Sequence, residues 1–133
     1  MRYWLAGFMI LAFGVLAAVP VSAHHSFAAQ FDSNKPIEVK GIVTKVEWMN
    51  PHVYFYVDVT DEGGKVNNWA LEMGAPAALA RTGWNRNLMK VGDQVIVKAT
   101  AAKDGSRLAN ARSVVMATTG KELGAASSER ATP

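Results

Sequence analysis

The feature that most constrains the fold is a series of short segments in which apolar and polar residues alternate. In the clearest segment, residues 53–59, one parity is entirely apolar and the other carries tyrosine and aspartate (Val53, Phe55, Val57 and Val59 against Tyr54, Tyr56 and Asp58). Successive side chains of a strand point to opposite faces of a sheet, so this period of two predicts a strand with one buried face. The Asp-Glu-Gly-Gly sequence at residues 61–64 predicts a tight turn after it.

Further periodic segments surround this strand and give the order of the elements. The alternation changes phase after Gly41, which predicts a long first strand with a bulge or a sharp bend. Pro76 suits the first turn of a helix and Gly83 suits its C-terminal cap, with Trp84 expected to cover the end of the barrel. The predicted elements besides residues 53–59 are a strand over 37–48, a strand over 65–73, a helix over 74–83, a strand from Gly92 and a strand over 108–117.

Three strands, a helix and two strands are the element order of the oligonucleotide/oligosaccharide-binding (OB) fold. We therefore predict a mainly β chain, a small five-stranded OB-like Greek-key barrel over residues 37–118 with one helix between its third and fourth strands. An open meander with a helix packed on one face is the alternative. Residues 24–36 are predicted to form an N-terminal arm. Residues 119–133, which are mostly small and polar, are predicted to be a disordered tail.

The first 23 residues predict export. Arg2 gives a basic start, residues 3–19 contain no charged residue, and Pro20 is followed by small side chains up to Ala23. This is the order of a secretory signal peptide cleaved after Ala23, so we expect a periplasmic or secreted protein. An uncleaved anchor is the alternative, because the uncharged stretch is just long enough to cross a bilayer, which takes about 20 residues. Contact with a membrane is expected only through this segment, if it stays uncleaved.

Composition excludes several kinds of protein. The mature chain, residues 24–133, has the size of one domain and contains no cysteine, which excludes disulfides, thiolate metal sites and cysteine catalysis. Of 14 basic and 11 acidic residues only Arg2 lies in the predicted signal peptide, so the mature chain has a formal charge of +2. Such a balanced charge, together with export, argues against a nucleic-acid partner.

The histidines suggest a metal site. After cleavage His24 is the first residue, and its free α-amine and imidazole can chelate one ion together. His52, in the loop after the first strand, would complete the three-nitrogen, T-shaped site that Cu(II) favours. His25 is a secondary candidate, because adjacent residues on an extended chain point opposite ways, and Met49 offers a soft ligand for Cu(I). Zinc would use the same nitrogens but would want a fourth ligand or water.

The metal site has alternatives. Its pattern resembles the histidine brace of copper-dependent oxidases and copper chaperones, but this resemblance rests on a terminal histidine and one other. The alternative is that the adjacent histidines belong to a disordered, exposed terminus and that His52 only caps a backbone group in a turn. A different function would use an aromatic strand face to bind a glycan, a peptide or a protein partner without any metal. Its candidate residues are Tyr54, Tyr56, Trp48 and Asn50, unless the tryptophans belong to the core and the tyrosines merely cover it.

Catalysis has little support in the sequence. No Ser-His-Asp order, phosphate loop or HExxH motif occurs. The spacing of Glu47, Asp58, Glu72 and Asp93 does not pair any two carboxylates, and Glu72 falls on the polar parity of an otherwise apolar segment. A binding role is therefore predicted ahead of turnover, with a copper oxidase as the weaker reading.

Several short motifs carry a resemblance to a known family. The chain resembles a family of small exported bacterial proteins of unknown function, which implies an exported, single-domain, OB-like protein and no particular activity. The matching pieces cover nearly all of residues 24–118: His24-His25-Ser26-Phe27, Gly41 to Trp48, Trp48-Met49-Asn50-Pro51-His52, Trp69-Ala70-Leu71-Glu72, Arg81-Thr82-Gly83-Trp84, Gly92-Asp93-Gln94-Val95 and Ala109-Asn110-Ala111-Arg112-Ser113-Val114.

Overall fold

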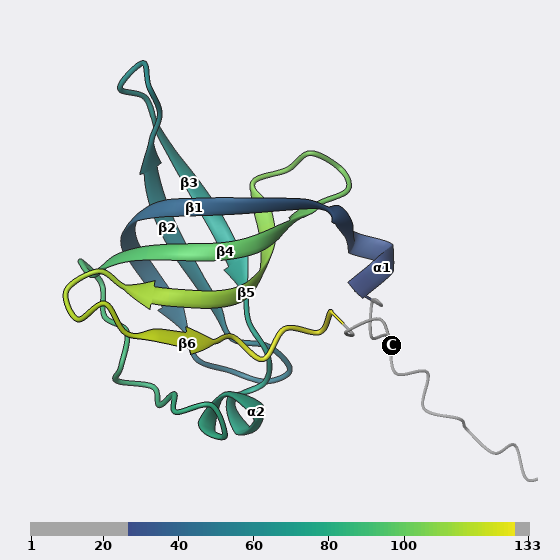
Figure 1. The fold of residues 1–133 in the computed structure, drawn as a ribbon, viewed down its shortest axis with the longest axis vertical. Coiled ribbons are helices and arrows are strands. Elements are labelled where there is room, and N and C mark those ends of the chain that lie inside the picture. Colours follow the sequence, from purple (N-terminus) through teal and green to yellow (C-terminus); the bar gives the residue numbers. More distant parts are fainter. Residues whose placement is uncertain (1–26, 130–133) are drawn as a thin grey trace, which may run out of the picture.

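The computed structural model describes residues 27–129 as a mainly β protein (Figure 1). The predicted signal peptide and the paired histidines lie outside the described residues. None of the helices within residues 27–129 has the length and apolar character needed to cross a membrane. The elements are α1 (Phe27–Gln30), β1 (Phe31–Glu47), β2 (Tyr54–Thr60), β3 (Val66–Glu72), α2 (Pro76–Ala80), β4 (Gln94–Ala102), β5 (Leu108–Met116) and β6 (Glu122–Gly124).

The strands form one sheet that closes into a ring. Their order is β3-β2-β1-β4-β5-β6, and an additional pairing between β3 and β5 closes the ring. Neighbours along this order are antiparallel, whereas β3 and β5 pair in parallel through residues 70–72 and 108–110. The ring leaves an inside for apolar side chains and an outside for polar ones. The open meander is therefore wrong, and the described chain has six strands where the sequence predicted five.

β1 is long because it pairs with two neighbouring strands, one after the other. Its first half pairs with β4 and its second half with β2, and Ile42 has a partner on both strands. At Gly41 the two neighbours come so close that an added Cβ would lie 2.0 Å from the carbonyl oxygen of Asp58. The predicted bulge is present a little later, between Val43 and Lys45. Glycine is therefore required where the strand passes from one partner to the other.

The barrel interior is apolar, as the alternation predicted. Val53, Phe55 and Val57 are completely buried, and Leu71 from β3 packs with them. Trp48 and Trp69 are partly buried and pack against the same core. Both tryptophans are thus part of the packing and not free rings on an exposed face.

One end of the barrel is covered by α2 and the turn after it (Figure 1). α2 is shorter than the predicted helix over 74–83, and Gly83 has the left-handed φ of +96° expected of a cap. Trp84 is buried, and its indole Nε1 donates a hydrogen bond to the carbonyl of Gly124 at 2.9 Å. The prediction that Trp84 covers this end is confirmed.

The two ends of the described chain are more ordered than the sequence suggested. Residues 31–36, assigned to a loose arm, are the start of β1. Residues 122–124, assigned to a disordered tail, form β6 along β5. Burial of Leu123 and Ala125 explains the second difference, since two apolar residues at alternate positions suffice for a short strand on an existing edge.

The close approach at Gly41 gives a first prediction. Gly41→Ala should lower the free energy of unfolding by about 1–3 kcal/mol, because the new methyl group must push β1 away from Asp58. Urea denaturation followed by circular dichroism measures this change. Gly124→Ala is the matched control, since a Cβ at Gly124 meets nothing within 4 Å. Equal stability of the two variants would contradict the proposed role of Gly41.

Candidate functional site

His52 lies in the loop between β1 and β2 and is held by the main chain. Its Nδ1 is 3.2 Å from the carbonyl oxygen of Met73. A carbonyl oxygen can only accept, so Nδ1 carries the hydrogen and Nε2 of the neutral ring keeps its lone pair. The backbone after His52 is fixed, because Val53 donates to the carbonyl of Gly74 and accepts from the amide of Met73. The half-buried ring therefore has a defined orientation with one nitrogen available.

The other predicted metal ligands are not assembled with His52 in the described residues. His24 and His25 lie outside them, and Met49 is 52% exposed in the same loop as His52. Among residues 27–129, no group of three or more His, Cys, Asp or Glu side chains could hold a metal ion. From the described part, His52 is thus the one histidine that can contribute.

The start of the described chain is anchored beside the turn between β4 and β5. The Lys103 amide donates to the carbonyl of Gln30 at 2.9 Å, and its ammonium group donates to the carbonyl of Ala28. The rings of Phe27 and Phe31 stack at 5.3 Å between centroids, and Phe31 is buried. Residues 24–26 are consequently the only link between this anchor and His24, and three residues span at most about 10 Å.

A row of polar side chains crosses the outside of the barrel. Tyr54, Glu72, Asn110 and Thr100 are successive cross-strand partners on β2, β3, β5 and β4. The Tyr54 hydroxyl donates to Glu72 Oε2 at 2.5 Å, and Asn110 Nδ2 donates to Glu72 Oε1 at 3.1 Å. Both carboxyl oxygens of Glu72 are therefore engaged although the residue is only 5% exposed.

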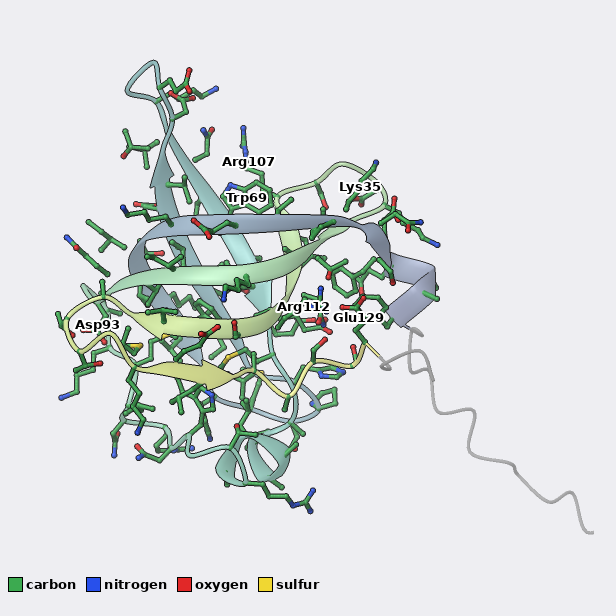
Figure 2. The ribbon with its side chains drawn as sticks, viewed as in Figure 1. Lys35, Trp69, Asp93, Arg107, Arg112 and Glu129 are labelled. Carbon is green, nitrogen blue, oxygen red and sulfur yellow. The ribbon has the colours of Figure 1, made fainter. Side chains whose placement is uncertain are left out.

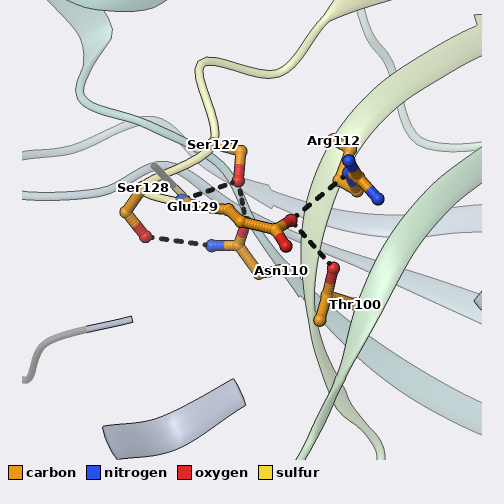
Figure 3. Close-up of polar contacts among 6 residues, drawn as sticks. All are labelled: Thr100, Asn110, Arg112, Ser127, Ser128 and Glu129. Carbon is orange, nitrogen blue, oxygen red and sulfur yellow. Dashed lines mark hydrogen bonds and ion pairs between the residues drawn. The ribbon is translucent and has the colours of Figure 1, made fainter. Parts of the chain in front are cut away.

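The chain after β6 lies over the part of this row formed by Asn110 and Thr100 (Figure 3). The Ser127 hydroxyl donates to Asn110 Oδ1, and Asn110 Nδ2 also approaches the Ser128 hydroxyl at 3.4 Å. The Thr100 hydroxyl donates to Glu129 Oε2 at 3.2 Å. Arg112 Nε lies 3.3 Å from the same oxygen, and Figure 2 shows the two charged side chains next to each other.

The predicted aromatic face has its hydroxyls already bound within the protein. Tyr56 lies beside Tyr54 on the outside of β2 and donates to Glu47 Oε2 at 3.2 Å, while Lys45 contacts the other oxygen of Glu47 at 2.6 Å. Burial and the negative charge of Glu47 raise the pKa of Tyr56. The hydrogen bond and charge of Lys45 lower the pKa of Glu47. Asn50 is exposed in the loop before β2.

Sequence reasoning missed most of the polar row. Alternation placed Glu72 on the polar face of its strand. The sequence prediction gave no role to Thr100, Asn110, Ser127 or Glu129. Asn110 did carry a signal, since it is the polar residue between two alanines in a strand. What the sequence lacked was the parallel pairing of β3 with β5, which brings Asn110 opposite Glu72.

Tyr54 gives a second prediction. Tyr54→Phe should reduce the free energy of unfolding by about 1–3 kcal/mol at neutral pH, because an oxygen of the buried Glu72 loses its donor. Burial and the bond to Glu72 raise the pKa of Tyr54. The unfolded tyrosine loses its proton from about pH 10, whereas the folded one keeps it, so stability falls as the pH rises above 10.

The fall in stability above pH 10 that Tyr54 causes should be absent in Tyr54→Phe. Urea titrations between neutral pH and pH 11 measure both effects. Tyr56→Phe is the matched control, with a smaller loss expected at neutral pH because Glu47 is partly exposed. A larger loss of unfolding free energy for Tyr56→Phe than for Tyr54→Phe would contradict the prediction that the hydrogen bond from Tyr54 to Glu72 is the more stabilising of the two.

Comparison with known proteins places the chain in a family without assigning an activity. Neither a curated protein nor a solved structure matched it. A family model described as "Family of unknown function (DUF6152)" matches residues 14–111, from within the predicted signal peptide to β5. This match confirms the resemblance predicted from the short motifs, and the chain belongs to this family of unknown function.

Proposed function

We propose that the chain is an exported, single-domain binding module that holds a copper ion between the mature N-terminal histidine, His24, and His52. The observation that carries the proposal is the hydrogen bond from His52 Nδ1 to the carbonyl of Met73. Metal-binding histidines commonly donate their other ring nitrogen to a carbonyl or a carboxylate, which fixes the tautomer and the ring orientation. His52 therefore has the surroundings of a ligand before any ion is bound.

The finer fold supports this proposal. We infer an OB-like barrel in which β1, β2, β3, β5 and β4 form the ring, α2 connects β3 to β4, and β6 is an addition on β5. In OB folds the loop between the first two strands borders the usual binding surface. His52 belongs to that loop, so the proposed ion would be bound where this kind of barrel ordinarily binds its ligands.

The ligand set follows from the proposed processing. Cleavage of a signal peptide after Ala23 would leave the α-amine and the imidazole of His24 as two nitrogens, and His52 would supply the third. Three nitrogens in a T-shape suit Cu(II), while zinc would want a further ligand or water. His25 and the exposed Met49 are secondary ligands. Since α1 is anchored near Lys103, ion binding would draw residues 24–26 across towards His52.

Storage, delivery or sensing of the ion fits better than turnover. Within residues 27–129 no further histidine or acidic cluster adjoins His52 to position a substrate. The second candidate function is recognition of a glycan, a peptide or a protein partner without metal, and it is favoured by the shared outward face of Tyr54 and Tyr56. Because their hydroxyls are bound to Glu72 and Glu47, only the ring faces could meet a partner there. Lys45 Nζ already lies over the Tyr56 ring, 5.4 Å from its centroid.

A copper titration tests the leading proposal. Mature protein with an authentic His24 terminus should bind Cu(II) with the electron paramagnetic resonance signal of a nitrogen-rich site. An acetyl group on the α-amine of His24, or His52→Ala, should weaken binding at least about tenfold, which corresponds to roughly 1.4 kcal/mol. Calorimetry measures the affinities, and His25→Ala is the matched control with a smaller effect.

Equal and weak binding by all of these proteins would rule out the three-nitrogen site. Mass spectrometry of exported protein provides an independent check. A mature terminus at any residue other than His24 would remove the chelating amine and with it this ligand set.

A further inference from the structure

The C-terminal strap, Ala126–Glu129, is attached to the barrel in an unusual way. In the described chain, its hydrogen bonds to the barrel run entirely through side chains, whereas the preceding Ala125 pairs by its main chain with Gly74 and Arg112. Ala126 also has a left-handed φ of +48°, a conformation that costs a non-glycine residue of the order of 1 kcal/mol. The strap is therefore held by exchangeable contacts on a slightly strained backbone.

The strap covers a surface that would otherwise be strongly polar. Glu72, Asn110 and Thr100 face away from the barrel core, yet they are 5%, 0% and 1% exposed. Polar side chains on the outside of a barrel need no cover, and burying them is costly unless each finds a partner. The strap supplies partners for Asn110 and Thr100, whereas both oxygens of Glu72 are already bound by Tyr54 and Asn110. The strap therefore satisfies a site complementary to hydroxyl and carboxylate groups.

The groups that the strap inserts define the chemistry of the site. Two hydroxyls, from Ser127 and Ser128, meet both ends of the Asn110 amide, and one carboxylate, from Glu129, meets Thr100 and Arg112. An amide that donates and accepts side by side is well suited to neighbouring hydroxyls. Arg112 beside a hydroxyl donor is suited to a carboxylate.

Space for a larger ligand continues beyond Glu129. Arg112 also lines an open hollow of about 490 Å³ between β1, β4 and β5, with Ile37 and Lys98 on its other sides. This volume lies in the range of small-molecule binding sites. Lys98 is held there by Glu122 at 3.0 Å, and Arg112 is paired with Glu129. Glu38 also lines the hollow, which therefore carries two cations and one carboxylate of its own.

We propose that the polar row of Glu72, Asn110 and Thr100, together with Arg112, is a binding site for an acidic oligosaccharide, and that the strap occupies it as an internal competitor. Sugar hydroxyls would replace Ser127 and Ser128 on Asn110 and donate to Glu72. A uronic acid carboxylate would replace Glu129 at Arg112 and Thr100, and the next sugar unit would extend into the hollow.

A sugar fits these contacts better than a peptide does. A peptide that adds to a sheet gains affinity from main-chain hydrogen bonds, and the strap makes none of these to the barrel within the described residues. The site shares no ligand with the proposed copper site. Failure of one proposal therefore leaves the other intact.

Strap release tests the proposal in the full mature chain. Ser127→Ala/Glu129→Ala should bind trigalacturonate at least about tenfold more tightly than the wild-type protein, because the wild-type affinity is reduced to the fraction of time that the strap leaves the site free. Adding Arg112→Gln to this variant should abolish the binding. The matched control, Ser106→Ala/Glu62→Ala, changes the same residue types in exposed turns and should behave like wild type. Calorimetry measures affinity, and circular dichroism verifies folding.

Three results would overturn the proposal. These are a folded strap-release variant that does not bind trigalacturonate, equal binding of neutral maltotriose, and preferred binding of the peptide acetyl-Ala-Ser-Ser-Glu-amide. If the strap-release variant does not fold, the proposal is tested by hydrogen exchange on the wild-type protein. Saturating trigalacturonate should then speed hydrogen exchange at the Glu129 amide, which donates to the Ser127 hydroxyl, and unchanged exchange there would also refute the proposal.

Discussion

The close contact between β1 and Asp58 at Gly41 is the constraint on which the rest of the structure depends. Because glycine has no side chain, β1 can leave β4 and join β2 within one residue, and one strand thereby holds both halves of the sheet. The ring can then close through β3 and β5. A closed ring leaves few free strand edges and creates a dry interior. The apolar side chains of every strand can therefore be buried together in that interior.

Ring closure also explains how residues distant in sequence form one polar row. Once the apolar parity points inward, Tyr54, Glu72, Asn110 and Thr100 must point outward, and strand pairing sets them side by side. Each could face water at little cost. The chain after β6 contacts Asn110 and Thr100, so part of the cover over the row comes from this C-terminal segment and not from the barrel.

Much of the barrel could be predicted from the sequence, because a period of two identifies strands and their buried faces without knowledge of partners. Glycine and proline likewise indicated the bend in β1 and the short helix. The pairing of β3 with β5 could not be predicted, since parity assigns Glu72 and Asn110 to a face but does not say which strands are neighbours. β6 was missed because Leu123 and Ala125 are too few to form a recognisable pattern. The role of the histidine pair depends on the predicted cleavage after Ala23, which lies outside the described residues.

The two candidate sites differ in how their side chains are held, and this difference bears on function. His52 is positioned by the main-chain carbonyl of Met73, and the adjacent Val53 is bonded through its main chain to Met73 and Gly74. The orientation of the ring therefore persists as long as the barrel is folded. Asn110 and Thr100 are satisfied by side chains of a terminal segment, and a ligand can replace such partners without breaking the sheet. A fixed imidazole suits an ion that demands defined geometry, whereas exchangeable hydroxyl and carboxylate contacts suit a ligand that must displace an existing occupant. In a chain this short, the same barrel can support both arrangements because one uses its loop and the other its outer face.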